Sequence, residues 1–134
     1  MKETLKIRGK LLSGAKKAAF FTELDWVKEQ CLDKLGFVPY PGTVNLEVLR
    51  DDVSKLILIK KEGGIRLIPP DPQFCEGRAL RASIEDVEGC IFIPPQDVNV
   101  HQPNIVEFMA PVMVKSSLGV EDGEMLTVTV EMGG

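Results

Sequence analysis

The stretch LGFVPYPGTVNL, residues 35–46, joins a helical pattern to a strand pattern and decides how the chain is organised. Before it, apolar residues at helical spacing share one face: Leu24, Val27, Cys31 and Leu35. Thr22 and Asp25 resemble a capping box, and Gly36 suits the end of a helix. After it, Val44 and Leu46 begin an alternation that is typical of a half-buried strand. The sequence therefore predicts a helix, a Pro/Gly turn and a strand in succession.

Outward from this stretch, the pattern is almost entirely that of short strands separated by turns. A first strand is expected from Leu5 to Leu11, with a bend or bulge at Gly9. Further strands are expected at 44–48, 56–59, 65–68, 80–84, 90–93, 105–109, 112–114 and 126–130. The segment SSLGVEDGE, 116–124, predicts one helical turn followed by a tight turn. One helix and many short strands with regular turns predict a mainly β fold, a small barrel.

Size and composition are those of one globular domain over 1–134, without a repeat or an internal linker. Apolar residues make up 44% and charged residues 27% of the chain. The net charge of −4 argues against nucleic-acid binding as the main function. The longest apolar runs are too short to cross a membrane, and the polar N-terminus does not read as a secretory signal, so a cytoplasmic protein is expected.

Cysteine and histidine are too few for several classes of site. Three cysteines without a CxxC pair fit a reducing compartment and buried thiols. With one histidine, a zinc site is disfavoured, and so are the Ser-His-Asp and Cys-His hydrolases.

Thr43 and Asn45 are the candidate metal ligands. If Val44 points into the core, both side chains project to the other face of the strand, two residues apart. A hydroxyl and an amide oxygen are hard, neutral donors of the kind that Mg²⁺ prefers when the phosphates of a nucleotide supply the charge. The alternative is that Thr43 faces solvent and Asn45 caps the turn. Judged from the spacing alone, this alternative is favoured over a metal site.

The segment SGAKKAAFF, from Ser13 to Phe21, is a candidate phosphate-binding loop. A glycine after a strand, followed by Lys16 and Lys17, could place backbone N–H groups and positive charge around phosphates. It is not a Walker loop, because GxxxxGK[ST] does not occur. The alternative is a solvated basic loop that covers a buried aromatic pair.

Further candidates lie in the second half of the chain. Glu107 interrupts an apolar run and faces either solvent or a cavity, where it could accept a hydroxyl group or activate it as a base. His101, in a Pro-bounded loop, is by itself more typical of a loop residue than of a catalyst. Lys115 and the serines that follow it could bind an anion or simply begin a helix.

Four segments, GKLLSG, LGFVPYPGTVNL, IVEFMAP and LGVEDGEMLTV, together resemble the archaeal riboflavin kinases that use CTP, over about Gly9 to Val130. The resemblance implies a six-stranded cradle-loop barrel and transfer of a phosphoryl group from CTP to the ribityl primary hydroxyl of riboflavin, giving FMN and CDP. It implies that Thr43 and Asn45 bind Mg²⁺, and that Glu107 and the loop of His101 lie on the flavin side. It assigns nucleotide contacts to Ser13, Gly14, Ala15, Lys16, Lys17, Ala18, Met113, Val114, Lys115 and Ser116.

The sequence departs from this family on the nucleotide side. Family members have a loop of the type S-G-x-G-x-G-[RK]-[YF], whereas Lys16 and Ala18 replace the later glycines here. Ala19 stands where the basic residue is expected, and Met113 where another is often present. The alternative function is therefore a flavin- or nucleotide-binding module of the same fold that has lost catalysis. A third hypothesis, ranked below both, is a small barrel that serves only in protein interaction.

Overall fold

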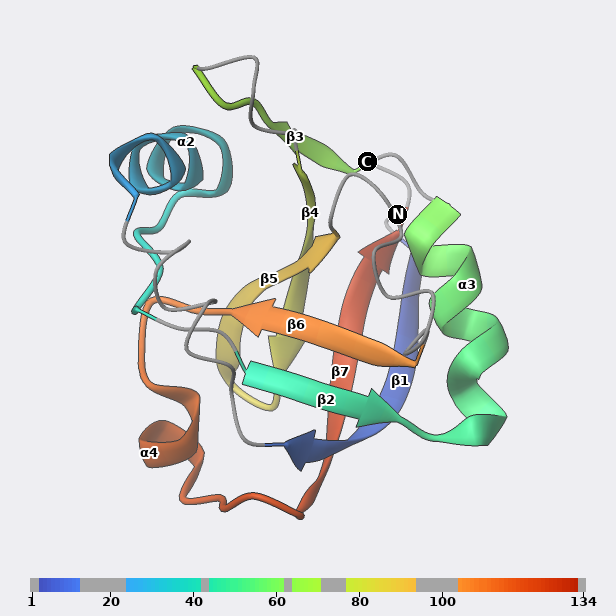
Figure 1. Ribbon diagram of the computed structural model, residues 1–134. Helices are drawn as coiled ribbons and strands as arrows, with labels where there is room; N and C mark the ends of the chain where they lie inside the picture. The colour runs from blue at the N-terminus through green and yellow to red at the C-terminus, as the bar shows by residue number, and fades with distance from the viewer. Residues whose placement is uncertain are drawn as a thin grey trace.

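The computed structural model describes residues 3–12, 24–41, 44–61, 64–70, 77–93 and 104–132 (Figure 1). The strands are β1 (Glu3–Leu12), β2 (Val44–Val48), β3 (Ile65–Leu67), β4 (Gly77–Ile84), β5 (Val87–Ile93), β6 (Ile105–Met109) and β7 (Met125–Met132). The helices are α2 (Asp25–Leu35), α3 (Val53–Lys61), α4 (Val114–Leu118) and the short 3₁₀ turn η1 (Arg50–Asp52).

The strands form an antiparallel sheet in the order β3-β4-β5-β6-β2-β1-β7, which closes because β4 also pairs with β7. Six strands make the closed barrel, and β3 is an extra strand on the outside edge of β4. Closure pairs the backbone groups that an open sheet would leave exposed at its edges. The mainly β, six-stranded barrel predicted from the sequence is confirmed.

Alternation along the strands fills the barrel with aliphatic side chains and one phenylalanine. Val44, Leu46 and Val48 of β2 point inward with Val106 and Phe108 of β6. Phe108 is fully buried and is the largest side chain in this core. The side chains between them, which include Asn45 and Glu107, therefore lie on the outer face of the barrel.

The helix α2 covers a second apolar cluster on the outside of the barrel. Val27, Cys31 and Leu35 face the sheet at helical spacing, as predicted, and pack with Leu67, Ala79, Cys90 and Met109. Gly36 ends the helix with a φ of 86°, a left-handed conformation that suits glycine. The predicted capping box is wrong, since the N-cap is Leu24 and makes no side-chain capping bond. Thr22 lies outside the described residues.

The predicted strand at 56–59 is wrong, because these residues form the middle of α3. Leu56 and Ile59, three positions apart, are buried, whereas Ile57 and Leu58 are 48% and 56% exposed. That is the pattern of a helix lying on a core, and a run of four apolar residues does not distinguish it from a strand. Figure 1 shows α3 on the side of the barrel away from α2.

Two smaller expectations are also corrected. The predicted strand at 112–114 is absent; Val114 instead begins α4 and is buried against the barrel core. No bulge interrupts β1 at Gly9, since the register with β7 runs unbroken from Glu3 to Lys10. Gly9 instead allows β1 to pack closely against β2, because a Cβ at this position would lie 3.0 Å from the Cβ of Leu46.

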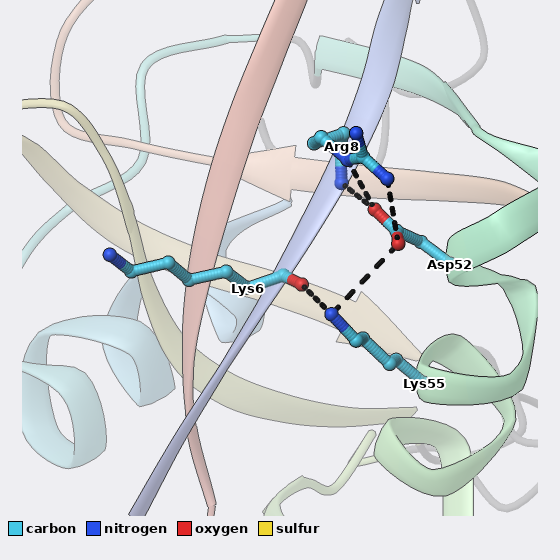
Figure 2. Close-up of polar contacts among 4 residues, drawn as sticks. All are labelled: Lys6, Arg8, Asp52 and Lys55. Carbon is cyan, nitrogen blue, oxygen red and sulfur yellow. Dashed lines mark hydrogen bonds and ion pairs between the residues drawn. The ribbon is translucent and has the colours of Figure 1, made fainter.

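An ion pair fastens the start of α3 to β1. Asp52 is 3% exposed and accepts hydrogen bonds from the backbone N–H of Arg8 at 2.8 Å and from its Nε at 3.0 Å (Figure 2). Lys55 Nζ lies 3.9 Å from the same carboxylate and donates to the carbonyl of Lys6. The hydrogen bonds from Arg8 lower the pKa of Asp52. This cluster fixes the connection between β2 and α3.

Candidate active site

Asn45 stands between two strands that carry other parts of the predicted site. In the antiparallel register it is the direct partner of Glu107 on β6 and of Leu12 on β1. Direct cross-strand partners project to the same face with Cβ atoms about 5 Å apart. The barrel therefore brings the predicted metal ligand Asn45 beside the predicted flavin-side residue Glu107.

Asn45 and Glu107 are held in a partly dehydrated position. Asn45 is 9% exposed, one of the few buried polar residues among those described. Glu107 is half-buried, and Phe92 is its register partner on β5. Asn45 is flanked on the other side by Leu12, which is also half-buried. An amide and a carboxylate oxygen in such a setting are well suited to hold a cation or a hydroxyl group.

A cleft of about 180 Å³ opens at the end of the barrel; Asn45 and Glu107 do not line it, but their chain neighbours Val44 and Phe108 do. Three stretches of chain contribute to its lining: the end of β1, the turn into β2, and the end of β6 with the start of α4. The residues are Leu12; Tyr40, Pro41 and Val44; and Phe108, Ala110 and 112–115. The backbone N–H of Tyr40 donates to the carbonyl of Ala110 at 2.7 Å, which fixes the turn to the end of β6. The cleft thus gathers the turn of the opening motif, the base of the predicted phosphate loop and the segment 113–115.

Lys115 is the basic residue in the lining of this cleft. Its Nζ lies 2.5 Å from Oδ1 of Asp122, and both side chains remain partly exposed. Ser116 Oγ donates to Sδ of Met113 at 3.2 Å. Of the four predicted contacts at 113–116, Met113, Val114 and Lys115 therefore line the cleft, and Ser116 follows directly.

Several predicted site residues lie outside the described residues. These are Thr43, His101 and the loop segment Ser13, Gly14, Ala15, Lys16, Lys17 and Ala18. The points where they leave the barrel are described, however. Ser13 follows Leu12 directly, and Thr43 precedes Val44, the first residue of β2.

The family model for the CTP-dependent riboflavin kinase domain, described as domain of unknown function DUF120, matches residues 11–130. The chain belongs to this family. A riboflavin kinase of Archaeoglobus fulgidus is 34% identical over 131 residues, which cover 95% of this chain and 55% of that protein. A riboflavin kinase of Methanobrevibacter smithii is 34% identical over 128 residues, covering 95% of this chain and 99% of that protein.

A riboflavin kinase of Pyrobaculum calidifontis is 30% identical over 135 residues, covering 95% of this chain and 60% of that protein. The chain thus spans little more than half the length of the Archaeoglobus and Pyrobaculum relatives and nearly the whole of the Methanobrevibacter one. The match to the riboflavin kinase family includes β2, β6, α4 and the last two residues of β1, which contribute to the cleft and to the Asn45–Glu107 pair.

The rest of the described fold was searched for a second cleft with predicted site residues, for a cluster of metal ligands and for a membrane-spanning helix. A wider cleft of about 470 Å³ lies beside the end of α2 and contains none of the predicted site residues. Its Arg81 donates to the carbonyls of Leu35 and Lys34 and thereby caps α2. Among the described residues, no three His, Cys, Asp or Glu side chains gather as metal ligands. None of the described helices has the length and apolar character needed to cross a bilayer.

Sequence reasoning missed two features of the cleft. Tyr40 lies in its wall, although the tyrosine was treated only as part of a turn. Asp122, the partner of Lys115, was treated only as part of a tight turn after the helix. Tyr40 reaches the cleft because the barrel brings its turn beside the end of β6, whereas Lys115 and Asp122 meet across the local turn that follows α4. Neither contact follows a regular spacing of aromatic or charged residues.

Proposed function

We propose that this chain transfers the terminal phosphoryl group of CTP to the primary ribityl hydroxyl of riboflavin, giving FMN and CDP. The observation that supports this most is the register of β1, β2 and β6, which sets Leu12, Asn45 and Glu107 side by side. The strand end from which the loop assigned to the phosphates begins thus lies beside the residue assigned to the metal and the residue assigned to the flavin. The relatives named riboflavin kinase and the family model support the same reaction.

The donor set of Asn45 and its surroundings suits Mg²⁺. Asn45 offers an amide oxygen, and Glu107 stands beside it with a carboxylate. In the proposal, Asn45 and Thr43 hold the cation, which supplies charge neutralisation to the phosphates when it is bound. Few protein charges are needed for such a site, because the phosphates of the nucleotide supply the negative charge.

Three of the residues assigned to the nucleotide, Met113, Val114 and Lys115, line the cleft. The segment from Ser13 to Ala18 begins next to Leu12, so it leaves the barrel beside Asn45. Lys115 lies in the lining and supplies a positive charge to the phosphate tail. Because phosphoryl transfer depends mainly on positioning and on charge neutralisation, these contacts provide what the reaction requires.

Glu107 is assigned to the acceptor. Its position next to Asn45 would bring a hydroxyl group bound to its carboxylate close to a phosphate held at Asn45. The carboxylate orients that hydroxyl and receives its proton as the hydroxyl oxygen bonds to the γ-phosphorus and the bond from that phosphorus to the β–γ bridging oxygen breaks, which releases CDP. His101, from the loop before β6, is proposed to lie on the flavin side as well.

The proposed activity is tested by mixing the protein with riboflavin, Mg²⁺ and each of CTP, ATP, GTP and UTP, and separating the flavins by chromatography. The proposal predicts FMN, with CTP as the best donor. Binding of riboflavin or nucleotide without FMN from any donor would favour the binding module instead, for which the replaced glycines at Lys16 and Ala18 are the motivating observation.

A further inference from the structure

Lys115 and Asp122 form an ion pair across the rim of the cleft. The Nζ to Oδ1 distance is 2.5 Å, and the two side chains are 37% and 43% exposed. Lys115 belongs to α4 and lines the cleft, whereas Asp122 lies in the turn between α4 and β7. In the described structure, therefore, the ammonium group of Lys115, which is assigned to the nucleotide phosphates, faces the carboxylate of Asp122.

The turn that carries Asp122 is tied to the base of the predicted phosphate loop. Gly123 N–H donates to the carbonyl of Leu11 at 2.7 Å, and Leu11 N–H donates to the carbonyl of Glu124 at 2.8 Å. Leu11 lies two residues before Ser13, where that loop begins. The other end of the turn is fixed by the bond from Val120 N–H to the carbonyl of Lys115 at 3.0 Å. These hydrogen bonds fix the backbone of the turn that contains Asp122, and Lys115 reaches the Asp122 carboxylate through a long side chain with several rotatable bonds.

We propose that Asp122 is a positioning residue that holds Lys115 until the phosphates of the nucleotide replace it as the partner of the ammonium group. The inference rests on the proposed function. A partly exposed ion pair is weak and easily screened, so several phosphate charges compete successfully for the same lysine. Asp122 then stays near bound phosphates as an uncompensated negative charge. Its presence therefore weakens nucleotide binding and favours a nucleotide whose charge a cation has already reduced.

The test compares CTP binding by the wild-type chain, Asp122→Asn and the matched control Glu121→Gln, using calorimetry at low salt with Mg²⁺. Glu121 is the neighbouring acid in the same turn, so its substitution removes the same charge at nearly the same place. Asp122→Asn is expected to lower the Kd for CTP roughly two- to fivefold, and Glu121→Gln to change it less. The gain should grow when Mg²⁺ is removed with EDTA and shrink in high salt.

A double variant separates this role from a purely structural one. In Lys115→Met the partner of Asp122 is gone, so adding Asp122→Asn should recover much less affinity than it does in the wild type. If the wild-type chain binds no CTP, the proposed function and this inference both fail. If it binds CTP but Asp122→Asn binds equally or more weakly, or Glu121→Gln gives the same gain, the inference alone is overturned.

Discussion

Asn45 on β2 and Glu107 on β6 are direct partners in the antiparallel register, on the outer face of the barrel. They are 62 positions apart in the sequence, and the closed barrel places them side by side. Asn45 comes from the motif assigned to the metal and Glu107 from the motif assigned to the flavin. Under the proposed function, this adjacency joins the two assignments into one site for phosphate donor and acceptor.

Glu107→Gln should impair the use of riboflavin more than the use of CTP. The amide keeps the size of the side chain but cannot take a proton from the hydroxyl, so a rate loss of roughly 10²-fold or more is expected if Glu107 acts as a base. Steady-state assays with each substrate varied in turn provide the measurement. Glu88→Gln, on the outer face of β5, is the matched control. An unchanged riboflavin KM together with an unchanged rate would remove Glu107 from the site.

The Arg8–Asp52 pair predicts a pH dependence of stability. Hydrogen bonds from Arg8 lower the pKa of Asp52 in the folded chain below its unfolded value of about 4. The stabilisation is therefore fully present above that unfolded value and is lost as the pH falls through the lower folded pKa.

Urea unfolding of wild type and Asp52→Asn between pH 7 and pH 3 measures this contribution. Asp52→Asn should be less stable at pH 7, and the difference should narrow below about pH 4. Asp51→Asn, the neighbouring substitution outside the hydrogen-bonded pair, is the control. A difference that stays constant over the whole range would contradict the assignment.

Two cysteines should be unreactive in the folded chain. Burial raises the pKa of Cys31 to about 11 and raises the pKa of Cys90 further above its ordinary value. The reactive thiolate is therefore scarce near neutral pH, and the side chains are covered by α2. In a Cys75→Ser background, a thiol reagent at pH 8 should label neither residue until urea is added, and both afterwards. Rapid labelling in native buffer would show that α2 does not seal this cluster.

Gly89→Ala should destabilise the barrel. A Cβ at this position would lie 2.0 Å from the carbonyl oxygen of Met109 and 2.8 Å from Cζ of Phe108. A backbone atom cannot move aside easily, so a loss of about 3 kcal/mol or more in the free energy of unfolding is expected. Denaturant unfolding compared with Glu88→Ala, its exposed neighbour, measures the effect. Equal stabilities would mean that β5 and β6 are less closely packed than described.

Most of the helices and strands could be predicted from local patterns of apolar residues. Helical spacing in α2 and alternation in β2 and β7 identified those elements, because each buries one face along its whole length. The run 56–59 failed because both faces of α3 are apolar over that one turn. There, the decisive signal was the contact between Leu56, Ile59 and the barrel core, which a local pattern does not contain.

The sequence names candidate site residues but does not show how they are arranged in space. Motif resemblance singled out Asn45, Glu107 and Lys115 individually. Their arrangement depends on the pairing of β2 with β6 and on the return of the turn before β7 to Leu11. Such pairings join residues far apart in the sequence, so spacing within one segment does not reveal them. The ion pair of Lys115 with Asp122 was missed for another reason: the two side chains meet only across the turn that follows α4.

The most direct test follows the γ-phosphate of labelled CTP into FMN, with wild type, Asn45→Ala and the control Glu47→Gln compared under Mg²⁺. Glu47 lies two residues along β2 on the same face as Asn45 but is exposed. The account predicts labelled FMN from wild type and Glu47→Gln, and a loss of roughly 10²-fold or more in Asn45→Ala with an unchanged circular dichroism spectrum. No labelled FMN from the wild-type chain, or equal labelling by a folded Asn45→Ala variant, would contradict it.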